Sequence, residues 1–528
     1  MAGNAHGCVA GRVADGGTPE AISYLAKTYF QQGTALLCRG QYREAENYLR
    51  QVLAIWPTHS GALNNLGTAI WQQGRAVEAE GYYRQALEVT PDDFGTLANL
   101  GNSLWEQSRP AEAVALYRRA LELEFNSAET QMNLGVALSD LGEFDEAIEW
   151  LESSLKLNPD SPAALDNIGM TLARQGKRDE AMVWYERALA VRPDFPEAHR
   201  NRSYIWLTHG DYERGWPEYE WRLGCRNLRI LPVPRPQWRG EDIQGRMILL
   251  HAEQGLGDVL QFIRFACAVR RRGPRRLIVA CPETLVRLVS RCPGVDAVQD
   301  WYAPLPGCDV HAPLMSLPAI LGTTLASLPG DYPYLSPDAA TVQRWRPIVD
   351  RCLESTAVDA PASVAAGGRV FRIGVAWQGN PRNRIDRWRS FPLGLLAPIA
   401  DLPGVRLISL QKGQGTEQIS SAGHRFPIAV LPEAGAGDDD RRDFLDTAAI
   451  MSLLDLVIAP ESAVAHLAGS LGVRAWVPLP VVADWRWLLD RDDSPWYPSM
   501  TLFRQGPTGD WTPVFRRMAD RLRAELSF

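Results

Sequence analysis

The stretch MILLHAEQGLGDVLQFIRFA (residues 247–266) changes the character of the chain. Its apolar run MILLHA predicts a buried strand, the turn that follows holds two glycines and one aspartate, Asp258, and the remaining residues have the apolar face of a helix. A strand that passes through a tight turn into a helix is the building unit of parallel sheets covered by helices. Asp258 is an acidic side chain at the mouth of this turn, a position that suits either a structural or a chemical role.

Short apolar runs alternate with helical stretches from this point to the end of the chain. The predicted strands form two sets, separated by a loose segment rich in Ala, Ser and Gly: 247–252, 276–281, 296–300 and 308–313, then 371–377, 405–411, 427–432, 454–460 and 475–480. This alternation predicts parallel sheets covered on both faces. We therefore expect an α/β part made of two facing Rossmann-like domains, with a linker between them and a final helix: 247–353, 354–370, 371–528 and, for the helix, about 510–526.

A repeat of 34 residues precedes this α/β part. Glycine recurs at 33, 67, 101, 135 and 169, and alanine recurs at 45, 79, 113, 147 and 181. This pattern is the signature of the tetratricopeptide repeat, in which small residues let two helices pack closely and stacked units share a core. It predicts an α-helical superhelix over 26–223, with five repeats and a degenerate sixth at 196–223. We expect residues 1–25 to be disordered and the proline-rich 224–246 to be a surface connector.

Asparagine follows the same period, in the first helix of each unit, which lines the groove of such repeats. An amide side chain can donate and accept hydrogen bonds at once, so these residues can clasp the backbone of an extended acceptor peptide. Alternatively, each asparagine only ties neighbouring repeats together, and the sequence leaves both roles open. The groove itself is expected to bind protein. The series is Asn65, Asn99, Asn133, Asn167 and Asn201.

The composition fits a globular protein, because 46% of the 528 residues are hydrophobic and 22% are charged. The formal net charge of -7 gives no general reason to bind nucleic acid. The first twenty residues lack the apolar core of a signal peptide, and no apolar run reaches the ~20 residues of a membrane span. The eight cysteines have no zinc-ligand spacing, which favours free thiols in a reducing compartment. We therefore expect a cytoplasmic protein.

Ligands of doubly wound sheets bind at the carboxyl ends of the strands, and four loops lie there in this sequence. In the last of them a helix begins near Ser462 and Ala463, where free amides and the helix dipole favour an anion; an ordinary capped turn is the alternative. The other loops add Lys412 and four arginines. Together they predict a diphosphate cradle. The loops are 253–258, 378–390, 411–415 and 459–462, and the arginines are Arg382, Arg384, Arg387 and Arg389.

A diphosphate cradle on one wall of a cleft and a carboxylate on the other suit glycosyl transfer. The growing charge of the leaving nucleoside diphosphate needs cations and helix amides. The attacking hydroxyl needs a general base, for which Asp258 is the first candidate and His251, at the end of the same strand, is the second. Gly255 and Gly257 are expected to leave room for the acceptor. Helix capping is the alternative role of Asp258.

Three motifs and the overall layout resemble known glycosyltransferases. GLGDVLQF (255–262), RSFP (389–392) and SAVAHLAGSLG (462–472) resemble glycosyltransferase family 9, the ADP-heptose:lipopolysaccharide heptosyltransferases. With VADWRWLLDRDDSPWYP (482–498), the layout is similar to that of bacterial tetratricopeptide-repeat glycosyltransferases. This resemblance implies a two-domain GT-B fold and a nucleotide-sugar donor that is a substrate. It also implies that the chemistry needs neither a cofactor nor a metal.

The resemblance also implies roles for individual residues. The aspartate of the GD turn, here Asp258, is the proposed base of the heptosyltransferases, and Arg389 stands where those enzymes have a lysine that contacts the donor phosphate. Glu461 and Ser462 match an acidic–hydroxyl pair before the last anion-binding helix, with glutamate in place of the usual aspartate. His466 matches a histidine of that helix, and helix packing is its alternative role.

Two further groups of residues remain open. The tryptophans of the last motif can stack on a base or sugar, or can pack in the core: Trp485, Trp487 and Trp496. The aspartates at 438–440 are expected to form a solvated loop and not a metal site. The sequence thus predicts a glycosyltransferase whose repeats recruit a protein acceptor. The alternatives are a protein-binding scaffold whose second half is inactive or senses a nucleotide, and an enzyme with a glycan acceptor.

Overall fold

The computed structural model describes residues 18–225, 228, 231–330, 332–355, 370–381, 383, 385–422, 425–432 and 443–526. The chain divides into two compact units, which meet in the sequence between Pro193 and Asp194. We call them unit 1 and unit 2. The division falls before the predicted end of the repeat domain at residue 223.

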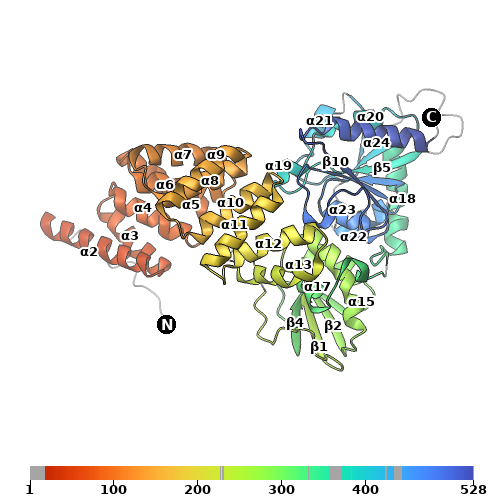
Figure 1. The fold of residues 1–528 in the computed structure, drawn as a ribbon, viewed down its shortest axis with the longest axis horizontal. Coiled ribbons are helices and arrows are strands. Elements are labelled where there is room, and N and C mark those ends of the chain that lie inside the picture. Colours follow the sequence, from red (N-terminus) through yellow and green to blue (C-terminus); the bar gives the residue numbers. More distant parts are fainter. Residues whose placement is uncertain are drawn as a thin grey trace. The chain divides into compact units, whose positions relative to one another are not determined.

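Unit 1 consists of antiparallel helix pairs that follow the 34-residue period (Figure 1). The first helix begins at Pro19, within the segment 1–25 that was expected to be disordered. Polar side chains start several of the later helices; Asp93, for example, accepts a hydrogen bond from the Thr96 N–H at 2.7 Å. The helices are α2 (Pro19–Cys38), α3 (Tyr42–Ile55), α4 (Ser60–Trp71), α5 (Ala76–Val89), α6 (Phe94–Glu106), α7 (Pro110–Leu123), α8 (Ala128–Leu141), α9 (Phe144–Leu157), α10 (Pro162–Arg174) and α11 (Arg178–Val191).

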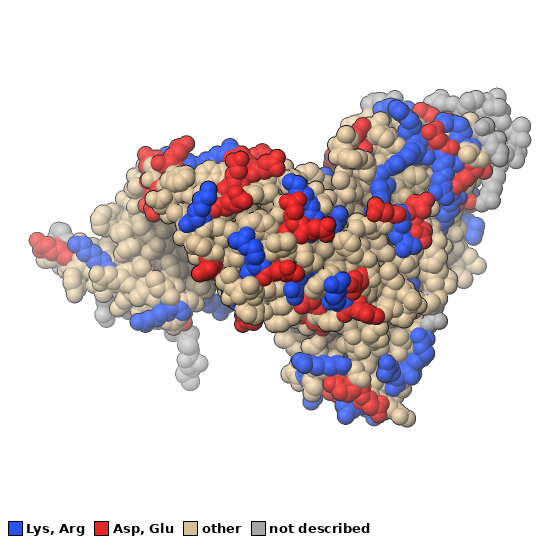
Figure 2. Space-filling view, viewed as in Figure 1, with Lys and Arg blue, Asp and Glu red and all other residues tan. Residues whose placement is uncertain are grey.

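The periodic glycines of unit 1 mark close contacts between the two helices of a pair. A Cβ on Gly101 would lie 2.5 Å from the Tyr117 ring, and Gly67 and Gly169 have the same relation to tyrosines. The alanines of the second series are fully buried. Charged side chains of both signs lie interspersed on the face of unit 1 in view (Figure 2), and Arg109 pairs with Glu80 of the preceding helix pair at 2.8 Å. The glycines and alanines of the 34-residue pattern therefore lie at close contacts between helices, as the sequence predicted.

The predicted sixth repeat shares the core of unit 2. It forms α12 (Pro196–Thr208), α13 (Tyr212–Tyr219) and a 3-10 turn, η1 (Glu220–Gly224). Trp216 of α13 is buried against Phe262, Trp485 and Trp496, with ring centroids 5.3–6.4 Å apart. These aromatic contacts explain why the pair belongs to unit 2, since large rings supply much of a core's buried apolar area.

The first sheet of unit 2 has four parallel strands in the order β3-β2-β1-β4. Its strands are β1 (Met247–His251), β2 (Arg276–Cys281), β3 (Ala297–Asp300) and β4 (Val310–Pro313). Helices α14 (Leu256–Phe262) and α16 (Glu283–Val289) pack on the face of Ile248 and Leu250. The other face is covered by Leu231 and Val233 of the connector. The connector is therefore part of the fold and not only a surface segment, and its Trp238 is buried.

The second sheet has six parallel strands in the order β7-β6-β5-β8-β9-β10. Counted within this sheet, the order is 3-2-1-4-5-6, the doubly wound order whose strand sequence reverses between β5 and β8. The strands are β5 (Phe371–Val375), β6 (Val405–Ser409), β7 (Ile428–Val430), β8 (Leu456–Ile458), β9 (Ala475–Leu479) and β10 (Met500–Arg504). Nine of the ten strands of unit 2 were predicted; β10 was not.

Helices cover both faces of the second sheet (Figure 1). On one face lie α20 (Ala397–Ala400) and α24 (Thr512–Glu525), which confirms the predicted final helix. On the other lie α18 (Ala339–Ser355), α22 (Phe444–Met451) and α23 (Ala463–Ser470), whose side chains share a core with the first sheet. The remaining helices are α15 (Ala266–Arg270), α17 (Leu317–Ile320), α19 (Asp386–Arg389) and α21 (Gln418–Ala422), with 3-10 turns at η2 (Ile263–Phe265), η3 (Leu314–Ser316), η4 (Leu325–Ser327), η5 (Leu393–Leu396) and η6 (Trp485–Trp487).

The predicted linker at 354–370 lies mostly outside the described residues, as do the aspartates at 438–440. Within the described ranges, no helix combines the length and the apolar composition needed to cross a bilayer. The seven cysteines of those ranges are free thiols.

Candidate functional site

Asp258 shapes the turn in which it lies. Gly255 is the N-cap of α14, and Asp258 Oδ2 accepts a hydrogen bond from the Gly255 backbone N–H at 2.9 Å. The capping role that the sequence left open is therefore present. It occupies one carboxylate oxygen; the other accepts a hydrogen bond from Arg486.

Arg486 connects this turn to the second sheet. Its Nη2 donates to Asp258 Oδ1 at 2.6 Å, its Nε to Gln261 Oε1 at 2.6 Å and its Nη1 to Asp484 Oδ1 at 2.9 Å. The guanidinium also lies 4.3 Å from the centroid of the Trp485 ring. Sequence reasoning missed this residue. Its one visible signal is an arginine between two tryptophans, in a segment 228 residues from Asp258.

Two opposing effects act on the carboxylate of Asp258. Burial raises its pKa, and the guanidinium of Arg486 lowers it, with a net pKa above the usual value. The side chain keeps about 20% of its surface exposed, so the carboxylate remains within reach of solvent.

Gly257 brings the starts of α14 and α23 together. A Cβ at this position would lie 2.8 Å from Cδ2 of His466 and 3.6 Å from Cα of Ala463. The space that was expected to receive an acceptor at Gly257 is therefore filled by the imidazole of His466. Its Nδ1 is 2.9 Å from the Tyr497 hydroxyl. Burial and the two arginines Arg486 and Arg389 lower the pKa of His466 to about 3, which makes it a neutral packing group near the site.

Glu461 lies in the turn between β8 and α23, and only 6% of its surface is exposed. Its Oε2 accepts a hydrogen bond from the Asp484 backbone N–H at 3.1 Å. Burial and the carboxylate of Asp484 raise the pKa of Glu461 to about 7, although Arg389 acts in the opposite direction. Asp484 thus contacts both Glu461 and Arg486, and residues 484–486 join the two predicted walls of the site.

Ser462 is the N-cap of α23, and its side chain does not cap the helix. Its Oγ is buried and has no hydrogen-bond partner within the part of the chain that the structure describes. A buried hydroxyl without a partner costs free energy, and its place at a helix start is compatible with a polar ligand there. Ala463 follows it with no side chain beyond Cβ. These two residues fit the predicted anion site.

Arg389 is held by its own loop. Its Nε donates to Asp386 Oδ1 at 3.1 Å, and Ser390 Oγ donates to Asp386 Oδ2 at 3.0 Å. A Cβ on Gly379 would collide with the Asp386 carboxylate and lie 2.9 Å from Arg389 Nη2, so the loop needs glycine there. Arg389 is close enough to influence the pKa of both Glu461 and His466. Arg382 and Arg384 lie outside the described residues, and Arg387 lies over the Trp388 ring.

The structure does not bring two other candidates to this cluster. The exposed Lys412 donates a hydrogen bond to Thr447 Oγ1 at 3.0 Å. His251 is fully buried, with Nε2 3.0 Å from Nδ1 of His311. Strand alternation puts His251 on the face of Leu249, opposite to the face that α14 covers. Burial and His311 lower the pKa of His251 to about 4. The tryptophans at 485, 487 and 496 are all buried in the core.

The asparagine series ties neighbouring repeats together in the first three positions. Asn65 donates to Thr34 Oγ1 at 3.0 Å, and Asn133 donates to Asn102 Oδ1 at 3.0 Å. Asn99 donates to Asn64 Oδ1 at 3.0 Å and more weakly to Thr68. For these three residues the structural alternative therefore applies.

The series changes at Asn167. The residue that would accept its hydrogen bond is Val136, which has no polar side-chain atom. In the described residues the Asn167 amide has no hydrogen-bond partner, and the side chain is half-buried. Asn201 is buried in unit 2, where its Oδ1 accepts hydrogen bonds from Arg200. Asn167 is thus the member of the series in unit 1 whose amide is open to a ligand.

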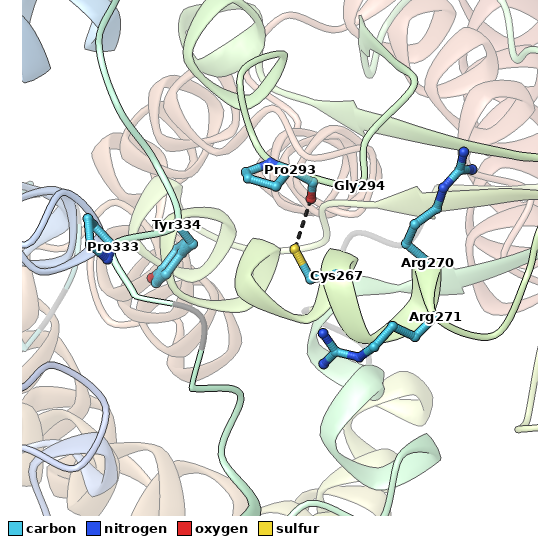
Figure 3. A pocket seen from close by; sticks show the side chains of 7 residues that line it. All are labelled: Cys267, Arg270, Arg271, Pro293, Gly294, Pro333 and Tyr334. Atoms are coloured by element: carbon cyan, nitrogen blue, oxygen red, sulfur yellow. Dashed lines mark hydrogen bonds between the residues drawn. The ribbon is translucent and has the colours of Figure 1, made fainter.

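One cavity, of about 410 Å³, lies away from all of these residues. Figure 3 shows Arg270 and Arg271 on one side of it and Pro333 and Tyr334 on the other, with Cys267 hydrogen-bonded to the Pro293 carbonyl between them. Arg270 is paired with Asp296 at 2.8 Å. Because no candidate residue lines it, the cavity gives no support to the predicted site.

Comparisons with known proteins identify the repeats. Models described as tetratricopeptide repeat match residues 33–57, 59–123, 99–162 and 163–192. Among solved structures, YrrB, described as a TPR protein with an unusual peptide-binding site, is 23% identical with a TM-score of 0.29, over 32% of this chain and 88% of that one. The Pseudomonas aeruginosa pilF protein is 22% identical with a TM-score of 0.33, over 38% of this chain and 98% of that one.

A curated relative extends the likeness beyond the repeats. Protein FlbA of Caulobacter vibrioides is 27% identical over 346 residues, which are 61% of this chain and 54% of FlbA. The matched share of the chain is larger than unit 1. The chain spans about half the length of this relative. Together, the period, the packing and the family models show that this chain carries tetratricopeptide repeats between residues 33 and 192.

Proposed function

We propose that unit 2 is a glycosyltransferase of GT-B fold that moves a sugar from a nucleotide-sugar donor to an acceptor hydroxyl. The observation that carries this proposal is the hydrogen bond from Arg486 to Asp258, in the turn after β1. Arg486 follows β9 of the second sheet, and its neighbour Asp484 contacts Glu461, which follows β8. Both regions follow strands at or beside the points where the strand order reverses, which is where doubly wound sheets bind ligands. The resemblance of the sequence motifs to heptosyltransferases supports the same reading.

The donor diphosphate is assigned to the start of α23. The unpartnered Oγ of Ser462 and the first amides of the helix offer hydrogen-bond donors, and the helix dipole favours negative charge. Arg389 supplies a guanidinium that can bridge phosphate oxygens. These groups would stabilise the charge that grows on the diphosphate as it leaves the sugar.

The acceptor side is assigned to Asp258. In the transfer step, the acceptor oxygen bonds to the anomeric carbon and the bond from that carbon to the diphosphate oxygen breaks. The hydroxyl proton moves to the Asp258 carboxylate. Burial supports this role, because a carboxylate with a raised pKa is a stronger base than an exposed one.

The acceptor is proposed to be a protein held by the groove of unit 1. Stacked repeats of this class bind proteins, and the open amide of Asn167 can pair with a peptide backbone whatever its sequence. A glycan acceptor is the alternative, and none of the described residues of unit 1 favours it.

One observation favours a second function, a binding scaffold with an inactive second half. Both carboxylate oxygens of Asp258 accept hydrogen bonds within the chain, so a purely structural aspartate would look the same. A nucleotide screen by thermal shift separates a unit 2 that binds a nucleotide from one that binds none, because a ligand at 100 times its Kd should stabilise the fold by about 2.7 kcal/mol.

The sharper experiment measures nucleoside-diphosphate affinity by calorimetry in Arg389→Ala. We expect a loss of about 1.5–3 kcal/mol, the range for a hydrogen bond to a charged group. Arg351→Ala, at an exposed position on α18, is the matched control and should bind like wild type. Equal affinity in both variants would remove Arg389 from the site, and no binding by wild type would favour the scaffold.

A further inference from the structure

Arg486 is the cation in direct contact with Asp258. It donates a hydrogen bond to each of three oxygen acceptors, and its side chain is only about 10% exposed. Two of those acceptors, Asp258 and Gln261, belong to α14, and the third, Asp484, belongs to the segment after β9. The hydrogen bonds to Gln261 and Asp484 fix the plane of the guanidinium group. The third hydrogen bond, from Nη2, therefore holds the Asp258 carboxylate in one orientation.

The other charged and titratable groups around Asp258 cannot replace Arg486. Arg222 is committed to Glu253 at 2.7 Å, with both side chains about 1% exposed. His466, which faces Gly257, is neutral, and Asp484 repels the carboxylate. The groups that face Asp258 are Arg486 of η6, Asp484 just before η6, Glu253 of its own loop, Arg222 of η1, Tyr204 of α12 and His466 of α23.

We propose that Arg486 is the positioning residue for Asp258: it orients the carboxylate in its partly buried turn and keeps it ionised, so that it is ready to accept a proton. This inference rests on the proposed function, in which Asp258 is the base. Because Arg486 belongs to the second sheet's part of the chain, the base is set only when residues 484–486 are docked on α14. The two walls of the site are then completed together.

The pH profile of kcat/KM tests this role. Removal of the cation in Arg486→Gln should raise the pKa of Asp258 further, since an arginine in contact lowers a carboxyl pKa by about 1–3 units. The acidic limb of the profile should therefore move to higher pH by about 1–3 units, with the donor KM changed less than about twofold. Arg486→Lys should return the acidic limb most of the way to its wild-type position, because lysine restores the positive charge. A merely structural arginine would lower activity equally at every pH, and that result would overturn the inference.

The control is Arg491→Gln, which removes an ion-paired arginine from the same segment; Arg491 pairs with Asp493 at 2.6 Å on the surface. Its pH profile should match that of wild type.

Urea unfolding provides a readout without turnover. The loss of stability in Arg486→Gln should be smaller in an Asp258→Asn background than in wild type, because the double variant no longer leaves a partly buried carboxylate without its cation. Strictly additive losses would overturn the positioning role. A wild-type protein that transfers no sugar but shows this coupling would instead refute the proposed function and leave the pairing of the two residues supported.

Discussion

The two units of this chain make their polar contacts over very different sequence distances. In unit 1, side chains bond across 27–35 residues, one repeat to the next, as in Arg109 with Glu80 and Asn133 with Asn102. In unit 2, Arg486 bonds to residues 225 and 228 positions away. A periodic chain displays its contacts in its spacing, whereas a pair of wound sheets gives no such sign. The candidate site is accordingly in the unit where the sequence was less informative.

Glycine shows the same contrast. Gly101 and Gly257 each stand where a Cβ would collide with a ring, of Tyr117 in one case and of His466 in the other. The first belongs to a visible 34-residue series. From the sequence, Gly257 was expected to leave room for an acceptor, because nothing in the spacing shows that its neighbour is His466, in the other half of unit 2.

The largest effect is expected for Asp258→Asn, which tests whether the long-range contacts of unit 2 build a catalytic site. Asp258→Asn keeps an oxygen for Gly255 but loses the basicity, so turnover should fall by roughly 10²–10⁴ with donor affinity nearly unchanged. Steady-state kinetics with one donor–acceptor pair measure this. Asp493→Asn, an exposed acid in the 484–497 segment, is the control. If Asp258→Asn keeps more than about a tenth of the activity, worth ~1.4 kcal/mol of barrier, Asp258 serves only to cap the helix.

The next effect concerns Glu461 and the pH dependence of stability. Its pKa of about 7 lies above the ordinary value, so the unfolded chain releases this proton at lower pH than the folded one. The contribution of Glu461 to the free energy of unfolding should therefore fall as pH rises from about 4.5 to about 7 and stay low above that. Glu461→Gln should gain up to about 2–3 kcal/mol at pH 8 and nothing at pH 4.5. Urea unfolding at both pH values measures this difference, with Glu354→Gln, at an exposed position of α18, as control. A gain that is equal at both values would contradict the raised pKa.

Gly257 sharpens the comparison at a smaller scale. Gly257→Ala places a methyl group against His466 and should cost about 1–3 kcal/mol, the range for overpacking. Gly255→Ala is the matched control, since its Cβ would be 3.4 Å from Asp258 Oδ2 and should cost little. Thermal unfolding of the two variants distinguishes them. Equal melting temperatures would mean that α14 and α23 are not in close contact.

The smallest effect is expected within the asparagine series of unit 1. Asn133→Ala removes a bond between repeats and should cost about 0.5–1.5 kcal/mol of stability, whereas Asn167→Ala removes none. For acceptor binding the order should reverse, with Asn167→Ala the weaker binder. Urea unfolding and an acceptor-protein titration measure the two properties. If both variants lose stability equally, Asn167 has a structural partner like the others.

The strands of unit 2 were predictable where apolar β-branched runs were long, and less so elsewhere. The run RLIVAC became β2 without change of bounds. β10 was missed because MTLFR follows a turn that holds two prolines, and its place at the sheet edge is fixed by pairing with β9. The pair α12 and α13 was assigned to the repeats because its spacing fits the period, but Trp216 packs in unit 2.

For the site, the sequence named Asp258, Ser462 and Arg389 from their places at strand and helix ends. It also named His251, which strand alternation turns to the opposite face, and it did not name Arg486. Proximity along a loop is a local property, but the direction of a side chain and its partner across two sheets are not.

The sequence by itself determined the repeats, the alternation of strands and helices, and the loops at which a ligand would bind, because periodicity and chain order are properties of the sequence. Only the tertiary structure decided which asparagine is left open, that His466 fills the space at Gly257, and that Arg486 reaches Asp258. Those outcomes depend on how buried aromatic side chains, Trp216 and Trp485 among them, seat one element against another. Packing between distant segments leaves no period in the sequence.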